Sequence, residues 1–104
     1  MKVSALDTRV VKFIEGLDKS SHAKVSHCFD LLEEFGSEIG PPHSKKVSKN
    51  LYELRISGQI AVRLLYVFRG EEAIVVHGFI KKTEKIPKRE LGVALQKLGF
   101  LHKR

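Results

Sequence analysis

Arginine, histidine and phenylalanine side chains fall at alternate positions of three segments in the second half of the chain. Residues 51–57, 60–69 and 73–80 alternate apolar with polar residues or are rich in β-branched and aromatic ones, which predicts three β-strands. One face of these strands carries Glu53, Arg55, Arg63, His77 and Phe79. A strand arginine presents a fixed fork of donors to phosphate oxygens, a histidine can transfer a proton, and an exposed ring can stack on a base. The pattern favours a site that binds a phosphate-containing polymer.

A basic run directly follows the third predicted strand and consists of Lys81, Lys82, Lys85, Lys88 and Arg89. By itself such a run is usually the solvated entrance to a helix, and Glu53 with Arg55 or Arg63 can form an ordinary cross-strand pair. A lone His77 is also more often a satisfied polar residue than a catalyst. The convergence of all these residues on one surface is what favours a functional site.

Positive charge is concentrated in the second half of the chain. The 104 residues carry a net charge of +7, of which residues 1–50 contribute +1 and residues 51–104 contribute +6. This asymmetry favours a polyanionic partner, with RNA or DNA first, although a basic surface also serves solubility. A chain of this length folds around one core, so we expect a single domain over residues 1–104.

Other chemistries find little support in the sequence. No glycine-rich loop precedes a Lys-Ser/Thr pair, so binding of a nucleoside triphosphate is not indicated. The five histidines lack the spacing of metal ligands, and Cys28, the single cysteine, falls on an apolar helical stripe. We therefore expect no metal site, no small-molecule cofactor and no disulfide within the chain.

The apolar segments are too short to cross a membrane. The longest, residues 60–68, is interrupted by Arg63 and falls far short of the roughly 20 residues that a spanning helix needs. Lys2 is not followed by the apolar run that is typical of a secretory signal. We therefore expect a cytoplasmic protein without membrane contact.

Three helices are predicted before and after the strands. Asp7 is expected to cap the first and a serine of the pair at 20–21 the second, while Pro87 suits the first turn of the third. Gly36 is expected to end the second helix and Gly99 the third. Their apolar faces consist of Val10, Phe13, Ile14 and Leu17; of Val25, Cys28, Phe29, Leu32 and Phe35; and of Leu91, Ala94, Leu95 and Leu98.

These elements predict an α+β fold with two N-terminal helices packed on a small antiparallel sheet of three to four strands, plus a C-terminal helix. Residues 1–5 are the candidate for the fourth strand, at an edge of the sheet. We expect the helices to cover one face of the sheet. That face carries Tyr52, Leu54, Ile56, Val62, Leu64, Tyr66, Phe68, Ile74, Val76 and Ile80. The opposite face is then left to solvent and to the candidate site.

Three motifs in this region follow one another in an order known from a protein family. They are KKVSKNLYELRISGQIAVRLLY at residues 45–66, HGFIKKT at residues 77–83 and the segment 87–95. In order and spacing, over about residues 10–98, the chain resembles the phage-derived HigB-like toxins of the RelE/ParE superfamily. The resemblance implies a RelE-like fold and a toxin of a type II toxin–antitoxin system. Glu53 stands near a position where some relatives carry a lysine, and the family's first strand is shortened or absent.

The resemblance further implies a ribosome-dependent messenger RNA endoribonuclease that inhibits translation without a metal. Its partners would be the ribosome, messenger RNA and a cognate helix-turn-helix antitoxin. Arg63 matches the strand arginine that holds the scissile phosphate, and Arg55 and Lys82 match neighbouring basic positions. His77 joins these as a candidate for proton transfer because of its strand face alone. The candidates for RNA binding are Lys45, Lys46, Phe79, Lys81, Lys85 and His102.

Two other functions stay open. A ParE-like inhibitor of DNA gyrase belongs to the same superfamily but acts on DNA, and the segment Lys81-Lys82-Thr83 favours the nuclease branch over it. A protein that binds nucleic acid or an antitoxin without catalysis would bind RNA with strong salt dependence and leave it uncut.

Overall fold

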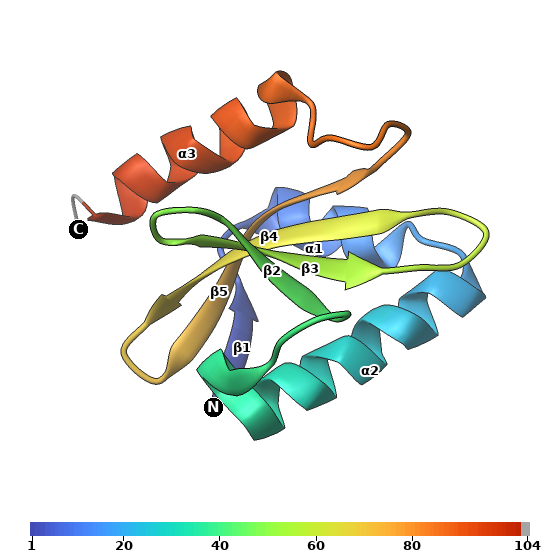
Figure 1. Cartoon of the computed structure of the whole chain (residues 1–104), viewed down its shortest axis with the longest axis horizontal. Coiled ribbons are helices and arrows are strands. Elements are labelled where there is room, and N and C mark those ends of the chain that lie inside the picture. Colours follow the sequence, from blue (N-terminus) through green and yellow to red (C-terminus); the bar gives the residue numbers. More distant parts are fainter. Residues whose placement is uncertain (103–104) are drawn as a thin grey trace.

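The computed structural model describes the backbone through residue 102 and the side chains through residue 101. Within this part of the chain lie three α-helices, one short 3₁₀ helix and five strands (Figure 1). In chain order they are β1 (Lys2–Ala5), α1 (Thr8–Glu15), α2 (Lys19–Phe35), the 3₁₀ helix η1 (Gly36–Glu38), β2 (Ser44–Ser48), β3 (Leu51–Ile56), β4 (Val62–Arg69), β5 (Glu72–Ile80) and α3 (Lys88–His102).

The five strands form one mixed sheet in the order β1-β5-β4-β3-β2. β1 runs parallel to β5, whereas the other neighbouring strands are antiparallel. The predicted antiparallel sheet of three to four strands is therefore only roughly matched. The edge strand predicted for residues 1–5 is present as β1, but nothing in the sequence indicated β2. Its segment SKKVS lacks apolar alternation, because the side chain that it buries is the polar Ser44. The Ser44 hydroxyl forms a hydrogen bond of 2.6 Å with the Tyr66 hydroxyl.

Helices cover both faces of the sheet, rather than one face as predicted. α1 and α2 lie against one face, and α3 crosses the other (Figure 1). The first core contains Val10, Val25, Cys28, Leu32, Leu54, Ile56, Val62, Leu64, Tyr66, Ala73 and Val75. The second core contains Leu51, Leu65, Val67, Ile74, Val76, Phe79, Ala94, Leu98 and Leu101. The face that carries the candidate residues is thus covered by α3 over much of its area.

An irregularity in β5 changes which of its side chains face each core. Leu65 of β4 pairs with His77, but the next residue, Tyr66, pairs with Val75, so Val76 is an extra residue in β5. Such a β-bulge shifts the alternation of side chains along a strand. The prediction that Ile74 and Val76 face the N-terminal helices is therefore wrong, because both lie in the second core beneath α3. Ile80 was expected in the core and is largely exposed instead.

The helix boundaries follow the capping signals in part. The Asp7 carboxylate accepts a hydrogen bond of 3.1 Å from the Val10 N–H, which confirms the predicted cap of α1. α2 begins earlier than predicted, because the cap is Asp18, which accepts from the Ser21 N–H at 3.2 Å. Gly36 ends α2 with a φ of 55°, in the left-handed region that suits glycine.

Two details of the apolar helix faces differ from the prediction. Phe35 is 48% exposed and Leu95 is 42% exposed, so neither belongs to a core. α3 continues past Gly99 to His102, because Leu101 is a further anchor of this helix in the second core. Among residues 1–102, no helix has both the length and the apolarity needed to cross a bilayer.

Candidate nucleic-acid interface

An open cleft lies where β3 and β4 meet the segment that follows β5. It has a volume of about 620 Å³ and is lined by Arg55, Ala61, Arg63, Lys81, Lys82, Thr83 and Glu84. Four of the predicted site residues, two arginines and two lysines, are therefore brought together. Four cations stand against one lining carboxylate, so the cleft suits an anion such as a phosphate group.

The two arginines face each other across neighbouring strands. Arg55 of β3 and Arg63 of β4 are direct cross-strand partners, an arrangement in which like charges repel. Glu53 compensates for this repulsion: one carboxylate oxygen lies 3.7 Å from Arg55 Nε and the other 3.7 Å from Arg63 Nε. The Glu53 side chain is only 3% exposed, so its charge is held beneath the cleft and not in solvent. The carboxylate therefore fixes both arginines from below.

Arg63 is held more rigidly than Arg55. Its Nη1 donates to the carbonyl oxygens of Val62 at 2.9 Å and of Ile56 at 3.4 Å, and its side chain is 8% exposed. Burial lowers the pKa of Arg63, the Glu53 charge opposes this shift, and the Arg55 charge adds to it. An arginine still remains a cation near neutral pH. Arg63 is thus a buried lining residue of the cleft with a fixed orientation, whereas the Arg55 side chain is 39% exposed and accessible to a ligand.

The buried charges are incompletely hydrogen-bonded. Among the described residues, Glu53 Oε2 and Arg63 Nε are buried and have no hydrogen-bond partner. Native proteins satisfy nearly all such atoms with protein or water partners, so each exception calls for a specific explanation, such as strain or a catalytic role. The sequence indicated Glu53 as an ordinary cross-strand partner of the arginines. No local pattern in the sequence reveals that this side chain is buried.

His77 and Phe79 lie outside the cleft. Phe79 is 5% exposed and belongs to the second core, so the predicted exposed stacking platform is wrong. His77 stacks on Phe79, with ring centroids 5.9 Å apart, and its Nε2 lies 3.0 Å from Glu90 Oε1 of α3. It lines a separate pocket of about 270 Å³ between α1 and α3. Both residues share the strand face of Arg63, as predicted, but α3 covers them.

The remaining RNA-binding candidates spread over a wider area. Lys81 is fixed at the cleft because its N–H donates to the Ala61 carbonyl at 2.7 Å. Lys85 is exposed in the segment between β5 and α3, beyond the residues that line the cleft. Lys45 and Lys46 are exposed on β2, opposite Glu53 and Tyr52 of β3. The side chain of His102 lies outside the described residues.

Metal binding has no candidate site in the described part of the chain, where no three histidine, cysteine or acidic residues come together as ligands. The cleft can nevertheless perform one kind of chemistry with its own side chains. Fixed cations around a phosphate stabilise the charge that develops on its oxygens in a displacement reaction.

The sequence around the cleft matches a known protein family. Residues 12–99 match the family described as phage-derived protein Gp49-like (DUF891). This range includes the cleft and all the elements from α2 to β5. No curated protein matches the chain.

Proposed function

The chain belongs to this Gp49-like family, which is part of the RelE/HigB-like toxin superfamily, and on that premise we propose that it is a toxin that cleaves messenger RNA on the ribosome. The family is of the toxin–antitoxin type, so an antitoxin partner is implied. The observation that carries the nuclease proposal is the cleft in which Arg55, Arg63, Lys81 and Lys82 converge above the buried Glu53. We further propose that the antitoxin is a helix-turn-helix protein and that the toxin acts in the cytoplasm.

The proposed reaction is an attack of the RNA's own 2′-hydroxyl on the adjacent phosphate. The new bond closes a 2′,3′-cyclic phosphate, and the bond to the 5′-oxygen of the next nucleotide breaks. The attacking hydroxyl loses a proton and the leaving oxygen gains one. Glu84, the carboxylate among the lining residues, can accept the first proton, and the ammonium group of Lys82 can donate the second.

The cations act on the phosphate itself. Negative charge grows on the nonbridging oxygens as the attack proceeds, and Arg63 is already oriented to meet it by its hydrogen bonds to backbone carbonyls. Arg55 and Lys81 extend the positive wall of the cleft. We assign His77 a positioning role, since it joins β5 to α3 through Glu90.

The test is expression of the full chain in growing bacteria, with mapping of messenger RNA ends. Arg55→Ala should lower the rate of RNA cleavage by about 10²–10³-fold, the range found when one group that stabilises charge in a transition state is removed. Arg63→Lys should also impair cleavage, because it keeps the charge but loses the fork geometry. Arg69→Ala is the matched control, since Arg69 is an exposed arginine at the far end of β4.

Three outcomes would contradict the proposal. Growth arrest with damaged DNA and intact messenger RNA would favour the gyrase inhibitor. Salt-dependent RNA binding without cleavage would favour the non-catalytic binding protein. Undiminished cleavage by a folded Arg55→Ala variant would remove the assigned role of the cleft.

A further inference from the structure

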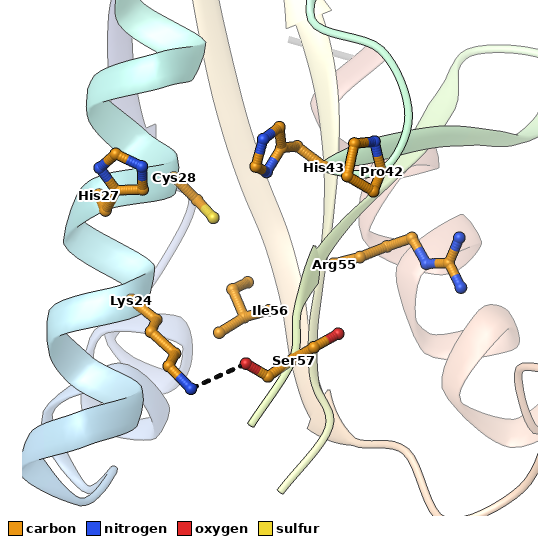
Figure 2. A pocket seen from close by; sticks show the side chains of 8 residues that line it. All are labelled: Lys24, His27, Cys28, Pro42, His43, Arg55, Ile56 and Ser57. Atoms are coloured by element: carbon orange, nitrogen blue, oxygen red, sulfur yellow. Dashed lines mark hydrogen bonds between the residues drawn. The ribbon is translucent and has the colours of Figure 1, made fainter. Parts of the chain in front are cut away.

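A second pocket, which shares only Arg55 with the predicted site residues, opens beside α2. Its volume is about 300 Å³, and its lining includes Lys24, His27, Cys28, Pro42, His43 and Arg55 (Figure 2). Lys24 Nζ donates to the Ser57 carbonyl at 3.0 Å and thereby joins α2 to the turn after β3 at one side of the pocket. The pocket is thus a defined cavity between a helix, the segment before β2 and the end of β3.

Arg55 is common to this pocket and to the phosphate cleft. Its N–H donates to the His43 carbonyl at 2.8 Å, which holds the pocket wall against β3. In Figure 2 the side chain of Arg55 extends away from His27 and Cys28, so one residue contributes to both cavities. A ligand that places a phosphate in the cleft can therefore reach the pocket by passing over the end of β3.

The pocket lining suits a flat, uncharged, aromatic group. Two imidazoles and a proline ring offer surfaces for stacking, and each imidazole also has a donor or acceptor nitrogen for a base edge. Burial raises the pKa of the Cys28 thiol, so the floor of the pocket is neutral at physiological pH. Lys24 and Arg55 are the charged members of the lining, and it includes no carboxylate. These two cations suit the phosphate groups next to an uncharged base held in the pocket.

Size restricts the occupant further. A volume of 300 Å³ is at the lower end of the range of small-molecule pockets, which is about 300–1,000 Å³. Proteins that read single-stranded RNA splay individual bases from the strand and hold them in pockets of this kind by stacking and edge contacts. A folded protein segment would need a longer groove.

We propose that this pocket receives one unstacked base of the RNA whose scissile phosphate lies in the neighbouring cleft, and so makes cleavage depend on the base at that position. The inference rests on the proposed function. His27 and His43 would stack on the base, while Lys24 contacts its edge or the adjoining phosphate. Arg55 links the two subsites, because its backbone belongs to the pocket wall and its guanidinium to the cleft.

The experiment uses the full chain with bacterial ribosomes that carry short synthetic messenger RNAs, which differ at one nucleotide beside the cleavage position and include one abasic nucleotide. The variants are His27→Ala and His43→Ala. His22→Ala is the matched control, because His22 is an exposed histidine of the same helix and does not line the pocket. Loss of one base–ring stack should weaken binding of the intact RNA roughly tenfold in each variant, within the range measured for aromatic stacking. Thermal unfolding shows whether each variant is folded.

A second readout does not depend on folding of the variants. Imidazole signals of His27 and His43 in the NMR spectrum of the unaltered protein should shift with the intact RNA and not with the abasic one. The signal of His22 should stay in place with both. Support for the proposal requires that the two pocket variants lose the preference between the intact and the abasic RNA.

The outcomes separate the two proposals. If messenger RNA is not cut on the ribosome, the proposed function fails, and the pocket inference fails with it. If RNA is cut and the pocket variants still discriminate against the abasic nucleotide as the control does, or if the two imidazoles do not respond, the pocket inference alone is overturned.

Discussion

On the face covered by α1 and α2, the buried part of the sheet is apolar except for the contact between Ser44 and the Tyr66 hydroxyl, whereas on the face covered by α3 the apolar packing gives way to charge. Leu54, Ile56, Val62 and Leu64 are completely or almost completely buried on the first face, and Tyr52, Tyr66 and Phe68 pack their rings together at centroid distances of 5.2–5.6 Å. The residues that alternate with these on β3 and β4 point to the second face, and they include the charged side chains of Glu53, Arg55 and Arg63.

This difference shows where the fold leaves room for chemistry. α3 anchors on the second core through Ala94, Leu98 and Leu101, and the cleft lies beyond the apolar part of that face. The ion pair between Glu53 and Arg63 lies where the apolar core ends and the cleft begins. Both side chains are buried, and Arg63 also lines the cleft, where it can contact a ligand. The face beneath α1 and α2 therefore contributes mainly to stability. The face beneath α3 carries both an apolar core and the residues of the cleft.

The largest expected effect concerns the buried charges. Glu53→Ala should lower the free energy of unfolding by about 3–5 kcal/mol, because it leaves Arg63 buried without a counter-charge. Urea denaturation measures the loss. The double variant Glu53→Leu with Arg63→Met should recover most of the stability but none of the RNA cleavage. Glu84→Ala, an exposed carboxylate of the same cleft, should stay within about 0.5 kcal/mol of the unaltered protein. Equal losses in the Glu53 and Glu84 variants would contradict the comparison of the faces.

A smaller loss of stability is expected when the hydrogen bond between Ser44 and Tyr66 is removed from the face beneath α1 and α2. Tyr66→Phe should cost about 1–2 kcal/mol, since the buried Ser44 hydroxyl then lacks its partner at 2.6 Å. Burial raises the pKa of Tyr66, although the Ser44 hydrogen bond opposes the shift, so the phenol is protonated near neutral pH. Tyr52→Phe on the neighbouring strand is the control. RNA cleavage should be unchanged in both variants, and a selective loss of cleavage in Tyr66→Phe would mean that the two faces do not differ in function.

The smallest effect is expected at an ion pair that connects a helix of one face with the helix of the other. Asp7, at the start of α1, forms an ion pair of 3.0 Å with Lys97 of α3. Burial by itself raises the pKa of Asp7, but the Val10 N–H and the Lys97 ammonium outweigh it, so the pKa is lowered from 3.8. Asp7→Asn keeps a capping oxygen and loses the charge, and should cost less than about 1 kcal/mol at pH 7.

The sign of the pH dependence follows from the lowered pKa. The unfolded chain binds the Asp7 proton at a higher pH than the folded chain, so the stabilisation is complete above the unfolded value of 3.8 and is lost as the pH falls through the folded one. Urea denaturation between pH 2 and pH 7 should show the Asp7→Asn variant and the unaltered protein converging at the acid end. A constant difference over this range would assign the effect to something other than the ion pair.

Local patterns could predict much of the fold. Asp7 as a cap, Gly36 as a helix end and the alternation in β3 and β4 are properties of short segments, and the structure confirms them. The grouping of Arg55 with Arg63 follows from the same alternation. β2 could not be found in this way, because its buried residue is Ser44, whose partner lies 22 positions further along the chain.

The errors at the candidate site share one cause, which is long-range packing. Phe79 has the strand face predicted for it, but whether that face is open depends on where α3 lies. The same placement pairs His77 with Glu90 of α3, away from the residues that line the cleft. The pocket at His27 and His43 forms between α2 and the segment before β2. The spacing of the histidines in the sequence does not indicate such a pocket, because it forms only when these two segments pack together.

The extra residue at Val76 is one place where this family member can vary in length. Beyond it, Gly78 faces the Phe13 ring, where an added Cβ would lie only 2.5 Å from a ring carbon, and His77 and Phe79 face α3. Deletion of Val76 would leave Val75 opposite Tyr66 and His77 opposite Leu65, so the strand would lose the bulge and every later side chain would keep its face. Insertions at the β4–β5 turn, around the exposed Gly70, would change none of this. A change of one residue in length at either site should therefore preserve the faces of β5 and the attachment of Lys81 and Lys82.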